Sequence, residues 1–255
     1  MILHAVEAGH GNPLVLLHGL FGSARNFGTV QRTFAQRYRT IALDLRNHGA
    51  SPHDNDMRYA AMAADVLQTL DRISALPATL LGHSMGGKVA MHAALTQPEQ
   101  VARLIVADIA PVPYTPRNHI TAAAMASLKL SPGMTRAQAD AALAEAVPDP
   151  AVRSFVLQNL QVGSSPAWRI GIAEIAAALP DVEGWDAPAE TLYSGPTLFI
   201  VGASSDYVQP EHRPAIRALF PNARFVTLKN AGHWLHADNP SGFIAVIEVF
   251  LTATA

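Results

Sequence analysis

A serine stands between two glycines in the motif Gly82-His83-Ser84-Met85-Gly86. The residues before it, 78–81, are typical of a short buried strand, and the small residues after it, 87–95, favour a helix. Where a strand reverses sharply into a helix, glycines two residues away on either side leave room for the turn, and the serine hydroxyl is exposed at the sheet edge. We therefore predict that Ser84 is the nucleophile of an acyl-transfer reaction.

The predicted base for Ser84 is His233, near the end of the chain. A serine hydroxyl is a poor nucleophile until a neighbouring base takes its proton. His233 follows the strand-like run 224–228, so we expect it on a loop at the same sheet edge as Ser84, and Gly232 lets the backbone bend to present the ring. A metal pair of His233 with His236 is the alternative, for which the sequence offers no evident third ligand.

The histidine also needs a carboxylate on its other ring nitrogen, to hold the tautomer and stabilise the imidazolium. Two aspartates are candidates: Asp108 ends the apolar run 103–107, and Asp206 follows the run 196–201. Both loops are expected at the same edge of the sheet. The residues by themselves therefore leave the choice of acid open.

Two backbone N–H groups are predicted to bind the negative charge that develops on the substrate oxygen. One belongs to Met85, directly after the nucleophile. The other belongs to Leu20, in the glycine-rich loop His18-Gly19-Leu20-Phe21-Gly22-Ser23 that follows an early strand. A phosphate-binding loop is the alternative for this segment, but neither Gly-x-Gly-x-x-Gly nor Gly-Lys-Ser/Thr is present.

The elements that must position these residues alternate between strands and helices, which favours a mostly parallel sheet with helices on both faces. The predicted strands are 13–18, 39–44, 78–81, 103–107, 196–201 and 224–228. Helical spacing is found at 59–73, 87–95 and 241–252. From about 115 to 180 the chain is alanine-rich and broken by prolines, and it shows helical patches without strand-like runs.

This pattern predicts an α/β core, residues 1–112 and 190–255, and a helical cap, residues 113–189, inserted after the sixth core strand. An insertion at the carboxyl end of a strand lies where such sheets bind ligands, so we expect it to act as a lid. Four large side chains in it, Met125, Met134, Phe155 and Trp168, are expected to pack between helices, with some of them lining an apolar acyl pocket.

Composition limits the classes of protein that the chain can belong to. The net charge of −2 gives no basic surface for nucleic acid, and the absence of cysteine excludes disulfides and thiolate chemistry. No apolar run is long enough to span a membrane, and the first residues lack the pattern of a secretory signal. We therefore expect a cytoplasmic protein, a monomer or homodimer, with a small-molecule substrate and with no metal or organic cofactor.

The motifs together identify the chain as a member of the α/β-hydrolases, and more narrowly it resembles the YbfF-type esterases and their eukaryotic relatives. Besides the loop 18–23, the motif 82–88 and residues 232–237, the matching segments are Asp44-Leu45-Arg46-Asn47-His48-Gly49-Ala50-Ser51-Pro52 and Asp108-Ile109-Ala110-Pro111-Val112. The resemblance implies the α/β-hydrolase fold. It also implies that the acid is Asp108, with Asp206 as the alternative and Ser205 as an auxiliary hydrogen-bond partner of the histidine.

The expected function is that of a serine hydrolase that cleaves carboxylic esters, and by extension thioesters, of short to medium acyl chains. Cofactor-free perhydrolases and carbon–carbon bond hydrolases use the same triad and stay open, as does a relative that binds a ligand without turnover. In the segment 44–52, Asp44 and Arg46 are expected to pair and hold loops around the site, and catalysis by His48 is not expected.

Overall fold

The computed structural model describes residues 1–189 and 191–253, so the expected start of the second core segment at 190 and its end at 254–255 lie outside the described residues. The main sheet has seven strands in the order β1-β3-β2-β4-β5-β8-β9. All neighbours are parallel except β1, which pairs antiparallel with β3. The strands are β1 (Ala5–Ala8), β2 (Pro13–Leu17), β3 (Arg39–Leu43), β4 (Ala78–His83), β5 (Val101–Ala107), β8 (Thr197–Gly202) and β9 (Ala223–Leu228).

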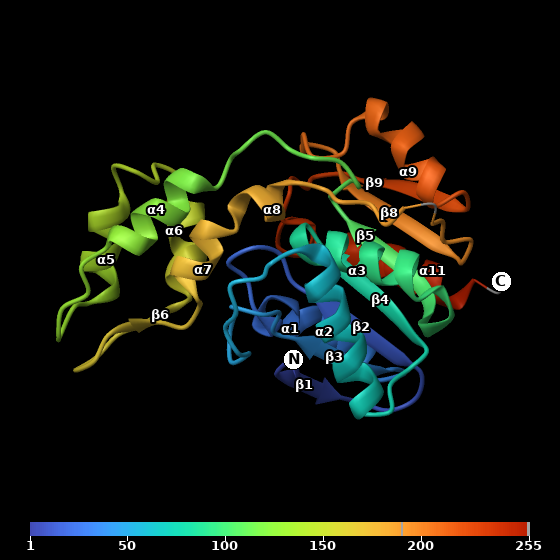
Figure 1. Ribbon diagram of the computed structural model, residues 1–255, viewed down its shortest axis with the longest axis horizontal. Coiled ribbons are helices and arrows are strands. Elements are labelled where there is room, and N and C mark those ends of the chain that lie inside the picture. The colour runs from blue at the N-terminus through green and yellow to red at the C-terminus, as the bar shows by residue number, and fades with distance from the viewer. Residues whose placement is uncertain (190, 254–255) are drawn as a thin grey trace.

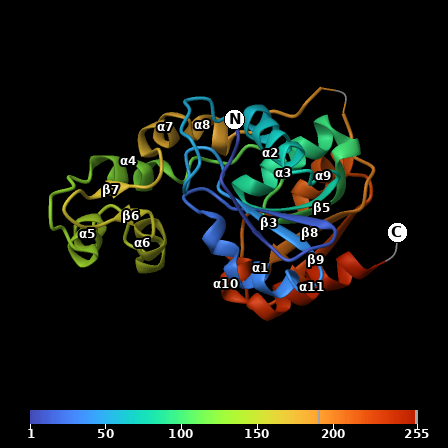
Figure 2. The ribbon, with the colours of Figure 1, turned by 90° about the horizontal axis from the view of Figure 1, so that it is seen from below.

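Helices cover both faces of this sheet, as predicted. In the core they are α1 (Gly28–Phe34), α2 (Tyr59–Arg72), α3 (Met85–Thr96), α9 (Arg213–Leu219), α10 (Leu235–Asp238) and α11 (Pro240–Thr252). Short 3₁₀ helices span Ala24–Phe27, Pro98–Gln100 and Pro210–His212. Figure 2 shows α1, α10 and α11 below the sheet and α2, α3 and α9 above it.

Successive side chains of a strand point to opposite faces, so each central strand contributes to two cores. In β2, Leu14 and Leu16 are buried in the cluster that includes residues of α1 and α11. Val15 and Leu17 belong instead to the cluster that contains residues of α2 and α3. The continuous apolar runs seen in the sequence are therefore explained by burial on both faces, which fixes the strands on which the site is built.

The segment 113–189, called the inserted segment below, leaves the sheet after β5 and returns before β8, and its helices α4 to α7 lie to one side of the core (Figure 1). Its helices are α4 (His119–Ser127), α5 (Arg136–Leu143), α6 (Pro150–Leu157), α7 (Ile172–Ala177) and α8 (Leu179–Glu183). It also holds a small antiparallel pair, β6 (Leu160–Gln161) with β7 (Ala167–Trp168).

Two expectations about this segment are corrected. It follows the fifth strand of the described sheet and not a sixth, because a single short strand, β1, precedes β2. The expectation that it contains no strands is also wrong, because β6 and β7 are only two residues each and show too little alternation to be recognised in the sequence.

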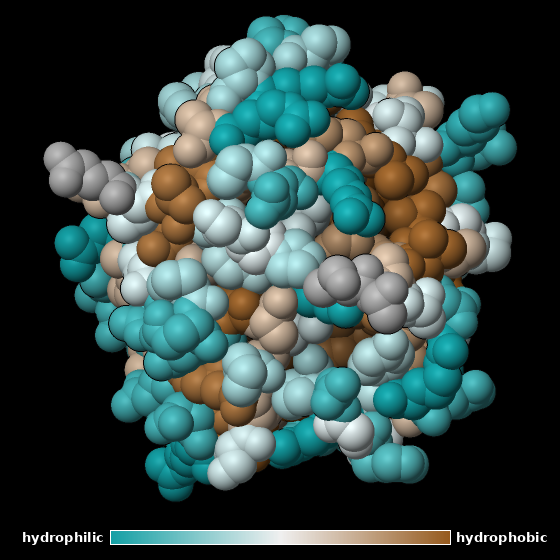
Figure 3. All heavy atoms as spheres, turned by 90° about the vertical axis from the view of Figure 1, so that its right-hand side faces the viewer, coloured by the Kyte–Doolittle hydropathy of each residue, from teal (hydrophilic) through white to brown (hydrophobic). Residues whose placement is uncertain are grey.

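On the side of the molecule away from the inserted segment, hydrophobic residues gather only in small areas among hydrophilic ones (Figure 3). Single exposed apolar side chains are normal on a protein surface. Among the described residues, none of the helices combines the length and the apolar character needed to cross a lipid bilayer.

Candidate active site

Ser84 lies at the junction of β4 and α3 with a φ of 53° and a ψ of −121°, a conformation that non-glycine residues rarely adopt. The glycines around it are required by space. A Cβ on Gly82 would lie 2.1 Å from the carbonyl oxygen of Gly86, and a Cβ on Gly86 would lie 2.3 Å from that of Leu17. The strained turn therefore raises the serine side chain at the carboxyl edge of the sheet.

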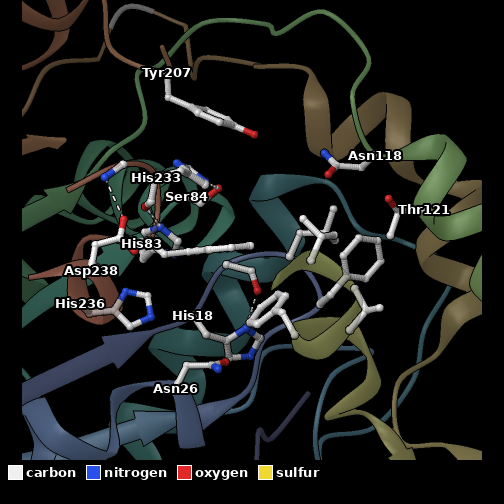
Figure 4. A pocket seen from close by; sticks show the side chains of 18 of the residues that line it. His18, Asn26, His83, Ser84, Asn118, Thr121, Tyr207, His233, His236 and Asp238 are labelled. Carbon is white, nitrogen blue, oxygen red and sulfur yellow. Dashed lines mark hydrogen bonds between the residues drawn. The ribbon is translucent and has the colours of Figure 1, made fainter. Parts of the chain in front are cut away.

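His233 and Asp108 lie next to Ser84, although they are far from it in the sequence (Figure 4 shows Ser84 and His233). The Nε2 atom of His233 is 3.0 Å from Ser84 Oγ, and its Nδ1 atom is 2.8 Å from Asp108 Oδ2. The three residues follow β4, β9 and β5, whose carboxyl ends meet at one edge of the sheet. This is the geometry that moves a proton from a serine hydroxyl to an imidazole held by a carboxylate.

Asp108 is fully buried and has every donor that its carboxylate needs. Its Oδ1 atom accepts the N–H of Gly202 at 2.9 Å, and its Oδ2 atom accepts hydrogen bonds from His233 and from the hydroxyl of Ser205. A buried carboxylate is stable only when such partners replace water. The side chain is therefore held in one orientation against the imidazole.

The two other residues proposed around the acid are placed differently. Asp206 is exposed and lies 2.9 Å from the guanidinium of Arg117, which lowers the pKa of this carboxyl. Ser205 was expected to bond the histidine, and this is wrong: its hydroxyl donates to Asp108. The reason is that Gly202 already binds Asp108, so the next turn of the loop brings Ser205 to the same carboxylate.

The segment proposed to bind an oxyanion runs directly beside Ser84. A Cβ on Gly19 would be 3.1 Å from Nδ1 of His83 and 3.2 Å from the Cβ of Ser84, so glycine lets the loop that carries Leu20 come this close without displacing these neighbours. Met85 is the first residue of α3, where a backbone N–H has no partner within its own helix. The two proposed donors therefore lie near Ser84 on different segments, Leu20 in the loop after β2 and Met85 at the start of α3.

A cavity of about 430 Å³ opens at Ser84 and His233. The core side supplies the loop residues 18–21 and the segment 232–238, and the inserted segment supplies Asn118, Thr121 and residues of α6. Figure 4 shows Asn118 and Thr121 across the pocket from Ser84. The apolar part of the lining consists of Leu20, Phe21, Phe27, Val152, Phe155, Val156 and Trp234.

Of the four large side chains singled out in the inserted segment, Phe155 lines this cavity and packs against Trp234, with ring centroids 5.5 Å apart. Met125 is buried between helices, and the indole of Trp168 donates to its carbonyl oxygen at 3.1 Å. Met134 is half-buried against the same core. The expected division between packing and pocket lining is what the structure shows.

Aromatic side chains around the imidazole were not recognised from the sequence. The ring of Tyr207 stacks on His233 with centroids 3.7 Å apart and an interplanar angle of 14°. His83 lies on the other side, where its Nε2 atom is 2.7 Å from the carbonyl oxygen of His233, and burial keeps its pKa well below the usual value. Tyr207 follows Asp206 directly, but no local pattern predicts that its ring folds back onto a histidine.

His236, the alternative metal partner of His233, packs its ring against His83, and burial lowers its pKa to about 4. Among the residues that the structure describes, no group of three or more histidine and carboxylate side chains is arranged to hold a metal ion.

The expected pair between Asp44 and Arg46 is not formed. Asp44 accepts the backbone N–H groups of Ala24 at 2.7 Å and Ala50 at 2.9 Å, whereas Arg46 pairs with the buried Asp65 at 2.7 Å. Each side chain is bound to other partners, so each one holds a different segment. Asp44 nevertheless stabilises the end of the loop that carries Leu20, as the sequence analysis expected of this region.

Lys88 is an unusual buried cation on α3. Its Nζ atom donates to the carbonyl oxygen of Gly184, at the end of the inserted segment, and lies 4.9 Å from the ring centre of Tyr114. Burial lowers the pKa of Lys88 to about 7, and the charge of Glu183 opposes this shift. The side chain therefore links α3 to the end of α8 in the inserted segment.

We expect the stability of the protein to report this lowered pKa. Between about 7 in the folded protein and 10.5 in the unfolded chain, the unfolded chain binds the proton more strongly, so the free energy of unfolding rises with pH. Lys88→Met lacks this contribution. The free energy of unfolding of the variant, minus that of the wild type, should therefore fall with rising pH by up to about 1 kcal/mol per pH unit. Urea unfolding of both proteins across this range measures it, and a difference independent of pH would contradict the prediction.

Comparisons with known proteins agree with the fold. Residues 12–240 match the family model described as alpha/beta hydrolase fold. The chain is 43% identical to the sn-1-specific diacylglycerol lipase ABHD11 of Mus musculus, over 93% of this chain and 80% of that protein. It is 38% identical to esterase YbfF of Escherichia coli strain K12, over 95% of this chain and 94% of that protein.

A solved structure, described as a marine microorganism esterase, superimposes with a TM-score of 0.94 at 33% sequence identity. The match covers 98% of this chain and 99% of that one. The resemblance to YbfF-type esterases that the motifs indicated is confirmed by these relatives. The chain therefore belongs to the α/β-hydrolase family and, within it, to the carboxylic ester hydrolases of the YbfF type.

Proposed function

We propose that the protein is a serine esterase that cleaves carboxylic esters of short to medium acyl chains through Ser84, His233 and Asp108. The observation that carries the proposal is the pair of consecutive hydrogen bonds, 3.0 Å from serine to imidazole and 2.8 Å from imidazole to a buried carboxylate, at the mouth of a largely apolar cavity. Such a nucleophile–base–orienter arrangement is the requirement for attack by a serine on an acyl carbon.

In the first half-reaction, Ser84 Oγ attacks the ester carbonyl while His233 Nε2 takes the hydroxyl proton. The N–H groups of Leu20 and Met85 bind the oxyanion of the tetrahedral intermediate. His233 then returns the proton to the departing alcohol oxygen, and the acyl group stays on the serine. In the second half-reaction, a water molecule loses a proton to His233 and attacks the acyl carbon. His233 then returns the proton to Ser84 Oγ as the bond between this oxygen and the acyl carbon breaks, and the carboxylic acid leaves.

Asp108 is the proposed acid because it touches the imidazole, whereas the carboxylate of Asp206 is bound to Arg117 at the surface. The carboxylate keeps the Nδ1 proton of His233 in place and stabilises the imidazolium that forms in each half-reaction. Ser205, through its bond to Asp108, positions this carboxylate.

Residues 113–189 are proposed to act as a cap that supplies much of the acyl pocket. The cavity lies between this segment and the core, and Phe155 and Val156 of α6 line it together with Trp234 of the core. A cavity of about 430 Å³ is at the lower end of the range of small-molecule sites. This volume supports short to medium acyl chains, and thioesters of the same acyl groups would present the same carbonyl carbon.

A series of p-nitrophenyl esters from acetate to palmitate tests the proposal directly. We expect kcat/KM to be highest for short to medium chains and to fall for palmitate, because the cavity between core and insertion limits the acyl length. A fluorophosphonate probe should label the protein once, at Ser84, as found by peptide mapping. No turnover of any ester, or labelling at another residue, would contradict the proposal.

Two assays beside this series test the other reactions that the sequence left open. Peroxide-dependent halogenation would reveal a perhydrolase, and cleavage of a ring-fission diketone would reveal a carbon–carbon bond hydrolase. A ligand-binding relative without turnover would label poorly with the probe. The oligomeric state and the cellular location expected from the sequence stay predictions.

A further inference from the structure

Phe21 has an unusual backbone in the loop next to the nucleophile. Its φ of 60° is in the left-handed region, where a bulky residue is strained. The N–H of Gly22 closes a turn onto the carbonyl oxygen of Gly19 at 3.0 Å, so Leu20 and Phe21 are the two central residues of this turn. A strained turn persists only when surrounding groups hold it.

The core holds the N–H of Phe21. This N–H donates to Nε2 of His48 at 3.1 Å, and Nδ1 of His48 lies 2.8 Å from the carbonyl oxygen of Arg46. Since a carbonyl can only accept, the proton of His48 is on Nδ1 and Nε2 is free to accept the N–H. His48 is fully buried, and this burial lowers its pKa to about 3, so the ring stays neutral.

The inserted segment holds the carbonyl of the same residue. Nδ2 of Asn159 donates to the carbonyl oxygen of Phe21 at 2.8 Å, across 138 positions of the sequence. Asn159 is buried and lies between α6 and β6, where its own carbonyl oxygen accepts the N–H of Arg169 at 2.9 Å. The side-chain amide is therefore fixed in the insertion and is not a mobile surface group.

We propose that Asn159 is a positioning residue of the oxyanion-binding loop, so that the insertion contributes to the chemical step as well as to the pocket. The proposal rests on the proposed function, in which the N–H of Leu20 binds the oxyanion. Both polar groups of the next residue, Phe21, are held from outside the loop, one by the core and one by Asn159. Without the hydrogen bond from Asn159, the turn can relax toward an unstrained conformation. This relaxation would change the direction of the Leu20 N–H, which belongs to the same turn.

The position of the Leu20 N–H matters only when negative charge develops on the substrate oxygen. Donors act in an oxyanion hole when they lie within about 3 Å of the oxyanion, and they gain little from the ground-state carbonyl. Loss of Asn159 should therefore lower kcat and leave KM nearly unchanged. A residue that merely anchors the insertion would instead change the thermal stability or, through the pocket, KM.

The test compares Asn159→Ala and Asn159→Asp with the wild type, using p-nitrophenyl butyrate. Alanine removes the donor, and aspartate is nearly isosteric but cannot donate to the carbonyl when ionised. We expect kcat to fall by about tenfold to a hundredfold, less than the loss of a whole oxyanion donor, with KM within about threefold. The neighbouring Gln158 is exposed, so Gln158→Ala is the matched control and should behave as the wild type.

A second measurement uses a trifluoromethyl ketone, which forms a tetrahedral oxyanion on the serine. Its affinity should fall in parallel with kcat, while inhibition by the product butyrate, a ground-state ligand, should not change. If Asn159→Ala fails to fold, Asn159→Asp decides the question. A folded variant with kcat within about twofold of the wild type, or with changes in KM and melting temperature only, would overturn the proposal.

The wild type separates this inference from the proposed function. If the wild-type protein hydrolyses no ester and is not labelled by the fluorophosphonate, the esterase proposal fails and the role of Asn159 fails with it. If the wild type is active and labelled, and only the Asn159 variants behave as the wild type, the esterase proposal stands and the positioning role alone is wrong.

Discussion

Replacing Ser84 with alanine is expected to lower kcat for p-nitrophenyl butyrate by about a millionfold. In a serine hydrolase with an intact base and acid, loss of the nucleophile leaves only the catalysis that the oxyanion donors and substrate binding provide. Alanine keeps the Cβ atom, so the strained backbone at φ 53° is unchanged and the fold should be as stable as in the wild type. The hydroxyl is the only group lost.

The measurement needs a serine control and a check on folding. Ser241 is exposed at the start of α11, and Ser241→Ala should retain full activity. Equal melting temperatures would show that Ser84→Ala is folded. Residual activity of Ser84→Ala above about one per cent of the wild type, in protein free of contaminating esterase, would mean that another group performs the attack.

Replacing Asp108 with asparagine is expected to lower kcat by about ten-thousandfold, the second largest effect. Asparagine is nearly isosteric, but it carries no charge to stabilise the imidazolium of His233. It also presents a donor where the buried site already contains the donors Gly202 N–H and Ser205 Oγ. The imidazole is then free to take the wrong tautomer, with its proton facing Ser84, and can no longer accept the hydroxyl proton.

Asp206→Asn is the matched control, because it makes the same change at the aspartate that is the alternative candidate for the acid. Its carboxylate is exposed and bound to Arg117, and an exposed pair of this kind contributes little. We expect kcat within about twofold of the wild type. If Asp206→Asn loses the activity and Asp108→Asn keeps it, the assignment of the acid is wrong, and the loop after β8 must move in solution to bring Asp206 to His233.

The fold was largely predictable because its signals are local. The segments 14–17 and 104–107 are apolar without interruption, as is typical of a short strand covered on both faces. The elements that were missed carry weaker signals. β1 is a half-buried edge strand of four residues, and the pair β6–β7 is shorter still. Such segments become strands because a partner is present and not because of their own residues.

The sharp turn at Ser84 was also predictable, since Gly82, Ser84 and Gly86 lie within one turn of the chain and their spacing imposes the geometry. The order of the loops along one sheet edge then brought His233 and two aspartates into range. The residues themselves could not choose between the aspartates, because the loops after β5 and β8 both open at that edge, and only the family resemblance favoured Asp108. Which carboxylate faces the imidazole depends on side-chain directions across some hundred residues.

By itself, then, the sequence determined most of the sheet, the turn that carries Ser84 and the sheet edge at which the proposed site residues meet. Tertiary structure showed that Asp108, which the resemblance had favoured, and not Asp206 touches His233. It alone decided that Ser205 bonds Asp108 and that Asn159 of the insertion holds the carbonyl of Phe21. The physical reason is the range of the interactions. Backbone sterics and strand burial act between near neighbours in the chain, whereas a hydrogen bond between distant side chains exists only after the core has packed and set their positions.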